Sequence, residues 1–283
     1  MSALENKIDF VALISVTNAN CNGDPTDGNR PRTDLNGRGE ISTVCIKRKI
    51  RNRMQDMGYA IFLQPDDNRK DDCKSQRERA DKELKGIKDR KTYAETACKK
   101  WMDVRSFGQV FAFTTNGKRG DGVSIGVRGP VTVHQGVSIS PVDIAEMKIT
   151  KSLNGEPGET RGRDTMGTIN FVRFGLYEIK GAINVQLAEK TGFTREDAAV
   201  IKECLRTLFV NDASSARPEG SMEVVKLYWW EHNCKDGQYS SAKVHRSVHV
   251  TPKNAEGLPQ CVDDYEITLD ELPGLTPEII DGL

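Results

Sequence analysis

Residues 8–17 read Ile-Asp-Phe-Val-Ala-Leu-Ile-Ser-Val-Thr, a run of apolar and β-branched residues. Such a run, bounded by polar and turn-forming residues, predicts a buried β-strand. The following residues, 18–40, are mostly Gly, Asn, Asp, Pro and Arg, and they form a longer stretch than an ordinary connection between elements. We therefore expect a functional loop or a disordered one directly after the strand.

A helix is predicted next, because Ser42 or Thr43 can cap a helix N-terminus and Gly58 can end a helix. The apolar residues of this segment are spaced along one helical face, at Ile46, Ile50, Met54 and Met57. The opposite face is basic. The start of the chain thus predicts a strand, a Gly-rich loop and a basic helix in succession.

Two later segments have the composition of insertions in a sheet. Residues 60–100 are mostly charged after a short apolar start, which predicts a helical insertion facing solvent. Residues 148–168 contain an Asn-Gly and a Pro-Gly pair in a basic, polar setting, which predicts a protruding β-hairpin. A disordered surface loop is the alternative for the second segment.

The remaining apolar runs predict the other strands of the main sheet, at residues 106–113, 123–142, 169–187 and 224–230. A second helix should open at residues 194–197, which have the sequence of a capping box. The order strand, helix, strands, helix, strand is that of ferredoxin-like and RRM-type domains. We expect an α+β fold with an RRM/ferredoxin-like palm, in a single domain of residues 1–283.

Composition limits the class of protein. Of the 283 residues, 37% are hydrophobic, which is enough for a sizeable core. Basic and acidic residues balance at 41 each, but residues 261–283 hold seven acidic residues and no Lys or Arg, so the body is basic and the C-terminal segment acidic. Seven cysteines without a C-x-x-C pair indicate reduced thiols in a cytoplasmic protein. We expect neither a signal peptide nor a membrane span.

The Gly-rich loop and the helix after it give the strongest functional signal. A Gly-rich loop entering a helix offers free N–H groups and the positive end of the helix dipole, which suit a phosphate. The candidate loop residues are Asn20, Asn22, Gly23 and Arg38.

The helix itself carries five cations in seven residues, between positions 47 and 53. Lys47 and Arg51 are four residues apart and share a face, and Arg48 lies beside them, so the three could follow a sugar–phosphate backbone. A solvated helix face is the alternative.

Three other places hold candidate RNA contacts. Residues 105–113 partly fit the ribonucleoprotein consensus of RRM sheets, with Arg105 and Phe107 as candidates, although core packing of these aromatic residues is the alternative. Arg128 can reach a phosphate from a strand end or stay exposed. In the predicted hairpin, a basic arm with a flexible apolar side chain can wedge between bases; its candidates are Arg161, Arg163 and Met166.

Catalytic and cofactor signals are weak. The chain lacks a phosphate-binding Walker loop, a dinucleotide fingerprint and the G-x-S-x-G and H-E-x-x-H motifs. His245 and His249 would have metal-like spacing only in a helix, and the alternation of residues 243–250 predicts a strand. The loop aspartates Asp24, Asp27 and Asp34 could hold hydrated magnesium. We expect no cofactor, no bound metal and no catalytic residues.

Several motifs together resemble a known family. They are Asn-Gly-Asp-Pro at 22–25, Arg-Pro-Arg-Thr-Asp at 30–34, the basic run 47–51, Asp-Val-Arg-Ser-Phe-Gly at 103–108 and Gly-Pro-Val at 129–131. The combination closely resembles the CRISPR-associated backbone subunit of the type I-C Cascade surveillance complex.

The resemblance implies a palm of RRM-like fold, helical fingers at residues 60–100 and a thumb at residues 148–168. It implies that copies of the chain stack head to tail along one CRISPR guide RNA and present it to target DNA. The family's phosphate-gripping helix corresponds to Lys47, Arg48 and Arg51. Its Gly-rich loop corresponds to Asn20, Asn22 and Gly23. Met166 would act as the wedge. The implied partners are the large, small and RNA-processing Cascade subunits, with no membrane.

Three functional hypotheses follow. The leading one is a non-catalytic scaffold that binds guide RNA in antiviral defence. The second is a metal-dependent endoribonuclease that uses the loop aspartates. The third is a solitary RRM-type protein that acts as a monomer.

Overall fold

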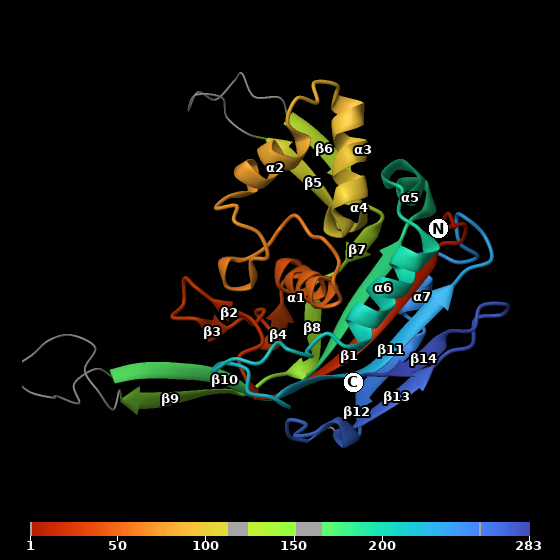
Figure 1. Ribbon diagram of the computed structural model, residues 1–283. Helices are drawn as coiled ribbons and strands as arrows, with labels where there is room; N and C mark the ends of the chain where they lie inside the picture. The colour runs from red at the N-terminus through yellow and green to blue at the C-terminus, as the bar shows by residue number, and fades with distance from the viewer. Residues whose placement is uncertain (1, 113–123, 151–165, 255) are drawn as a thin grey trace, which may run out of the picture.

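The computed structural model describes residues 2–112, 124–150, 166–254 and 256–283 (Figure 1). Within these residues an antiparallel sheet of eight strands forms the centre, in the order β14-β11-β1-β10-β8-β4, with β7 and β9 also pairing with β10. The mixed α/β fold with a large antiparallel sheet agrees with the predicted class. The strands are β1 (Ile8–Ala19), β4 (Arg38–Ile41), β7 (Val131–Val133), β8 (Gly136–Pro141), β9 (Ile144–Thr150), β10 (Met166–Ile183), β11 (Met222–Glu231) and β14 (Glu278–Asp281).

The predicted first strand is confirmed, and it lies in the middle of the sheet between β10 and β11. Successive side chains of a strand point to opposite faces, so β1 contributes to two cores. Phe10 and Ile14 pack with residues of helices α1 (Thr43–Asp56) and α6 (Arg195–Arg206). Val11 and Leu13 pack on the other face. Burial on both sides explains why the strand sequence is a continuous apolar run.

The second face of the sheet is covered by the C-terminal part of the chain. Its core includes residues of helix α7 (Ser241–His245), strand β12 (Val248–Pro252) and strand β13 (Tyr265–Leu269). An RRM binds RNA on an open sheet face through aromatic side chains. In this chain the sheet is covered on both faces around β1, so bases cannot stack there without displacing the C-terminal segment.

Both predicted helices are confirmed, and their ends follow the local rules. The side chain of Ser42 accepts a hydrogen bond from the Cys45 N–H at the start of α1. Thr194 and Asp197 form the expected reciprocal capping box of α6. A short helix, α5 (Val185–Thr191), precedes α6. The apolar residues Ala198, Ile201 and Leu205 of α6 are buried, as is Leu208 just beyond the helix.

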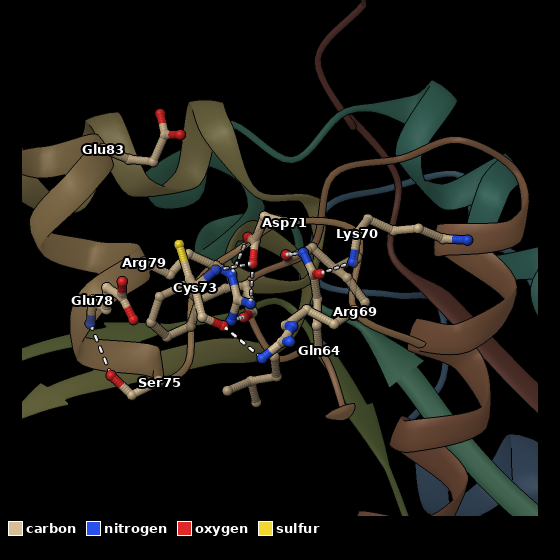
Figure 2. A network of polar contacts seen from close by, with 12 residues as sticks. Gln64, Arg69, Lys70, Asp71, Cys73, Ser75, Glu78, Arg79 and Glu83 are labelled. Carbon is tan, nitrogen blue, oxygen red and sulfur yellow. Dashed lines mark hydrogen bonds and ion pairs between the residues drawn. The ribbon is translucent and has the colours of Figure 1, made fainter. Parts of the chain in front are cut away.

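The charged segment 60–100 contains helices, as predicted, and together with Trp101, Val104 and Phe111 it forms a core of its own. It contains the short 3₁₀ helix η1 (Asp66–Asn68) and the helices α2 (Gln76–Leu84) and α3 (Arg90–Lys100), above the sheet in Figure 1. Arg79 of α2 donates to both carboxylate oxygens of Asp71, at 2.6 and 2.7 Å. Figure 2 shows the two side chains facing each other. Arg79 also donates to the Phe62 carbonyl at 2.8 Å. This bidentate pair fixes the loop before α2 to the helix.

The strand predicted at residues 106–113 is wrong in its first part and in its sheet. Residues 102–107 form helix α4 (Met102–Phe107), which ends where Gly108 adopts a φ of +80°. Strand β5 (Gly108–Ala112) follows and pairs with β6 (Ser124–Arg128) in a separate two-stranded sheet. Phe111 is buried against Phe62 and Tyr93 in the insertion core. Phe111 thus serves the insertion core, and this segment is not a strand of the main sheet, as the match to the ribonucleoprotein consensus had required.

The expectation of one strand over residues 243–250 is also partly wrong. Ser240 caps the short helix α7 through the Lys243 N–H, and a strand begins only at Val248. This cap decides against an extended chain, although the sequence alternates. His245 therefore lies in a helix and His249 in strand β12.

The predicted hairpin is partly described. Strand β9 pairs with the first part of β10, from Thr150 opposite Met166 to Ile144 opposite Val172. Strand β9 and the first part of β10 extend away from the rest of the chain in Figure 1. The hairpin stem is longer than predicted, since it begins at Ile144. Arg161 and Arg163 lie outside the described residues.

The acidic C-terminal segment is part of the fold. It contains the 3₁₀ helix η2 (Val262–Asp264), and its β13 pairs with β12, while β14 extends the main sheet beside β11. All seven cysteines are free thiols. Among the described residues, the structure has no helix long and apolar enough to cross a membrane.

A buried polar cluster lies around Asp9 of β1. The Nε2 atom of His232 lies 2.8 Å from the Asp9 carboxylate. His245 Nε2 lies 3.0 Å from the Gly181 carbonyl and 3.7 Å from Asp9. Burial lowers the pKa of His245 below its usual 6.5, against the opposing effects of the Gly181 carbonyl and Asp9.

This depressed pKa predicts a pH dependence of stability. The unfolded chain takes up the proton first, so the free energy of unfolding should be highest above pH 6.5 and fall as the pH drops below it. Denaturant titrations on both sides of that pH measure the slope. His245→Gln can still donate to the Gly181 carbonyl and should flatten it. An equal slope in the variant would contradict the assignment.

Candidate nucleic-acid interface

The Gly-rich loop is organised by the residues that the sequence singled out. The side chain of Asn22 accepts a hydrogen bond from the Ser42 N–H at 2.8 Å, which ties the loop to the start of α1. Asn20 donates to the Asn29 carbonyl at 2.6 Å. A Cβ atom on Gly23 would lie 2.6 Å from the backbone carbonyl oxygen of Asn29, so only glycine fits. Asn20, Asn22 and Gly23 therefore build the loop and join it to the helix.

The loop contains two short pairings, β2 (Gly23–Asp24) with β3 (Arg30–Pro31), and β4 with β8 of the main sheet. In Figure 1 these strands lie beside α1. Arg38 opens β4 and its side chain is exposed. The loop therefore has a defined structure, and Arg38 lies in the short strand that directly precedes α1 in the chain.

Two of the loop aspartates close turns. Asp24 accepts from the N–H and hydroxyl of Thr26 at 2.9 and 2.7 Å, and these bonds hold its pKa below the usual value. Asp34 accepts from the N–H groups of Asn36 and Arg38, and the Arg38 bond contributes most to its lowered pKa. Both carboxylates thus serve as turn acceptors. No group of three or more metal-ligating side chains occurs among the described residues.

The five cations of the basic helix α1 differ in whether they have a carboxylate partner within the chain. Lys49 is buried and pairs with Asp212, and Arg53 pairs with Asp56 at 3.1 Å. Arg51 is only 7% exposed and pairs with Asp103 at 3.0 Å. Three of the five cations therefore have carboxylate partners within the chain.

Lys47 and Arg48 differ, because neither forms an ion pair with a carboxylate in the described residues. Lys47 is half-buried over the ring of Phe107, 5.3 Å from its centroid. Arg48 donates one hydrogen bond, to the Leu63 carbonyl. Burial and the positive charge of Arg51 lower the pKa of Lys47. Positive charge is therefore in excess on this part of α1.

The ring of Phe107 contacts cations of α1, so it is not free to stack on an RNA base. The guanidinium of Arg51 lies 5.0 Å from the ring centroid, on the same residue that Lys47 covers. Phe107 also packs against the main core. The ring of Phe107 thus attracts the charged groups of both Lys47 and Arg51 and keeps these two groups close together.

The sequence profile of the family described as CRISPR-associated protein Cas7 matches residues 6–270. The chain belongs to this family. A curated relative from Haloferax volcanii (strain ATCC 29605), "CRISPR-associated protein Cas7", is 22% identical over 297 residues, covering 98% of this chain and 85% of that protein. The family assigned from the sequence motifs is thereby confirmed.

Two solved chains are also similar to this Cas7 protein. One, from a "CRISPR RNA-guided surveillance complex, pre-nicking", is 15% identical, covers 84% of this chain and 81% of its own, and has a TM-score of 0.49. The other, from a "CRISPR RNA-guided surveillance complex", is 17% identical, with 85% and 74% covered and a TM-score of 0.47.

Other predicted contact residues of this Cas7 protein lie away from Lys47 and Arg48 or have internal partners. Arg105 donates to both oxygens of Asp197, at 2.8 and 2.7 Å, and so joins α4 to α6. Arg128 is exposed in β6 and lines a cleft of about 510 Å³ with residues of α3 and α5. Met166 opens β10 at the far end of the described hairpin stem.

Asp103 is a site residue that the sequence analysis did not single out by itself. It is 1% exposed, and its carboxylate reaches Arg51 from a segment 52 positions away in the sequence. The sequence of α1 does indicate that such a residue is needed, since Arg51 lies next to the apolar face formed by Ile50 and Met54. A cation so placed needs a buried counter-charge.

Proposed function

We propose that this Cas7 protein is a non-catalytic scaffold that binds CRISPR guide RNA through the first turns of α1 and the loop before it. Membership of the Cas7 family supports a crRNA-binding backbone role in CRISPR defence. The observation that carries the finer proposal is the excess positive charge at Lys47 and Arg48, which have no carboxylate partners in the described residues. Phosphate is the counter-ion that would neutralise it.

Arg38 completes the proposed contact set. It is exposed, and among the described residues it has no ion pair with a carboxylate. Arg51 takes a supporting role in this proposal, because its guanidinium is buried on Asp103. Arg105 is left out because Asp197 holds it. Arg128, Arg161, Arg163 and Met166 remain proposed contacts for other parts of the RNA.

The wider organisation is part of the same proposal. The main sheet with α1 and α6 would be the RRM-like palm, the helical insertion the fingers and the β9–β10 hairpin the thumb. Copies of the chain would stack head to tail along the guide RNA, as in type I-C Cascade. The other Cascade subunits would bind to this assembly. The bases of the guide RNA would stay free to pair with target DNA. A chain that contacts only phosphates would accept any guide sequence.

Salt dependence tests the proposal on the unmodified protein. Three cations on a single-stranded phosphate backbone predict that the logarithm of the association constant falls with the logarithm of salt concentration with a slope of about −2. Fluorescence anisotropy with an RNA too short for two copies measures this slope. Two RNAs of unrelated sequence should bind alike. A flat salt response, or a strong preference for one sequence, would contradict backbone binding.

Incubation of the protein with RNA and magnesium checks the endoribonuclease alternative. Asp24 and Asp34 are occupied as turn acceptors, and no observation on the described residues favours cleavage. We therefore expect intact RNA. Cleavage that disappears in Asp34→Ala would establish the enzyme instead.

A further inference from the structure

One buried carboxylate connects the basic helix to the helical insertion. Asp103 of α4 is 1% exposed and accepts three hydrogen bonds. Its Oδ1 accepts from the Phe62 N–H at 2.6 Å, and its Oδ2 accepts from the Leu63 N–H at 3.1 Å and from Arg51 Nε at 3.0 Å. The carboxylate thus holds a side chain of α1 and the main chain at the start of the insertion at once.

The same main-chain segment holds Arg48. Its Nη1 donates to the carbonyl of Leu63, the residue whose N–H is bound by Asp103. A guanidinium has five N–H donors, and the described contacts of Arg48 use one. In the part of the chain that the structure describes, the other four donors of Arg48 are therefore free to bind a ligand. The direction in which its guanidinium points depends on the position of Leu63. Asp103 sets that position without touching Arg48.

The three neighbouring cations of α1 repel one another, and Asp103 compensates part of this repulsion. Arg51 lies against Asp103 but stands close enough to Lys47 and Arg48 to lower the pKa of both. The negative charge of Asp103 opposes this effect at Arg48. Without the carboxylate, the buried Arg51 would lose its counter-charge and repel its two neighbours.

We propose that Asp103 is a positioning residue for RNA binding: through Arg51 and the Phe62–Leu63 main chain it fixes Arg48 in the orientation that meets a phosphate. The inference rests on the proposed function, because it assumes that Arg48 contacts RNA. It assigns Asp103 no contact with RNA. The fingers segment and the phosphate-binding helix would then form one unit, with Asp103 at their junction.

A double-mutant cycle tests this role. RNA affinity is measured by anisotropy for the unmodified chain, Arg48→Ala, Asp103→Asn and the double variant, with thermal unfolding of each sample recorded beside it. An asparagine at position 103 keeps the size but has one acceptor oxygen and turns an NH₂ group toward a donor. We expect each single variant to bind about tenfold more weakly, and the double variant to be no weaker than Arg48→Ala alone.

The cycle separates positioning from general damage. If Asp103 only stabilises the fold, Asp103→Asn should weaken binding by the same factor with and without Arg48, and additive losses would overturn the inference. Unchanged affinity in Asp103→Asn would also overturn it. If Arg48→Ala itself binds RNA normally, the proposed function fails at this residue and the inference fails with it, which is a different outcome from additivity.

Glu83→Gln is a matched control, since Glu83 of α2 pairs with Lys100 of α3 at 2.7 Å within the same insertion, and neither residue has a described contact with the Phe62–Leu63 main chain. This variant also removes one carboxylate charge, and it should bind RNA with unchanged affinity. If it weakens binding as much as Asp103→Asn does, the effect comes from loosening the insertion, and the positioning role is refuted.

A second background keeps the test decisive if Asp103→Asn does not fold. Arg51→Gln with Asp103→Asn replaces the buried ion pair by a neutral hydrogen-bonded pair. In this background the same result is expected, a loss of about tenfold that is not increased by Arg48→Ala. Additive losses there would again overturn the inference.

Discussion

Replacement of both Lys47 and Arg48 by alanine should weaken the binding of single-stranded RNA by about 100-fold. Each side chain lacks a carboxylate partner in the described residues, so under the proposed function its loss removes a phosphate contact and breaks no ion pair. A charge-assisted contact is worth at least about 1.4 kcal/mol, or a factor of ten, and the two contacts are expected to add. The salt slope should also become shallower by about 1.4, since each lost phosphate contact removes about 0.7.

A control pair with the same charge change is available on another part of the surface. Arg195 lies 3.3 Å from Glu231, and Lys235 lies 2.5 Å from Glu189. Their joint replacement by alanine also removes two positive charges, but affinity for RNA should change less than about threefold. Equal losses in the two double variants would mean that net charge, rather than this helix, determines binding.

Gly129→Ala should destabilise the fold by more than about 4 kcal/mol, or prevent folding. A Cβ atom at this position would lie 2.3 Å from the Ser106 carbonyl oxygen and 2.4 Å from both Gly108 N and the carbonyl carbon of Phe107. All three are backbone atoms, so no side-chain rotation relieves the overlap. The main chain at position 129 can therefore pass this close to residues 106–108 only if position 129 is glycine.

Gly126→Ala is the matched comparison, because a Cβ atom there meets nothing within 4 Å. It should change the free energy of unfolding by less than about 0.5 kcal/mol. Urea unfolding followed by circular dichroism measures both variants. Similar stabilities would show that the segments do not cross as closely as described. The Gly129 crossing also fixes Phe107, on which Lys47 and Arg51 lie.

The elements predicted correctly from the sequence are those whose limits are set by neighbouring residues. Strand β1 follows from its own apolar run, and α1 and α6 follow from caps at Ser42 and Thr194 together with regular apolar spacing. Helix α4 was missed because distant contacts decide it, with Asp103 binding two N–H groups about 40 positions away. The cover on the second sheet face was missed because it consists of short elements, each with little periodicity.

The candidate site shows the same division. The spacing of Lys47, Arg48 and Arg51 correctly indicated a basic helix after a loop, and the family followed from the combined motifs. Spacing alone placed Lys47 and Arg51 on one face and could not tell that Arg51 turns inward. That direction depends on Asp103, which no rule of local sequence connects to α1. The subtype of the complex remains a prediction.

Photocrosslinking from α1 is the most direct test that this helix faces RNA. Val44 is 75% exposed and lies three and four residues before Lys47 and Arg48, so a photoreactive residue there should point the same way. Ile279 on β14 is 52% exposed and serves as the comparison. We predict an RNA adduct from position 44 and none from position 279. An adduct from position 279 with none from position 44 would contradict the account.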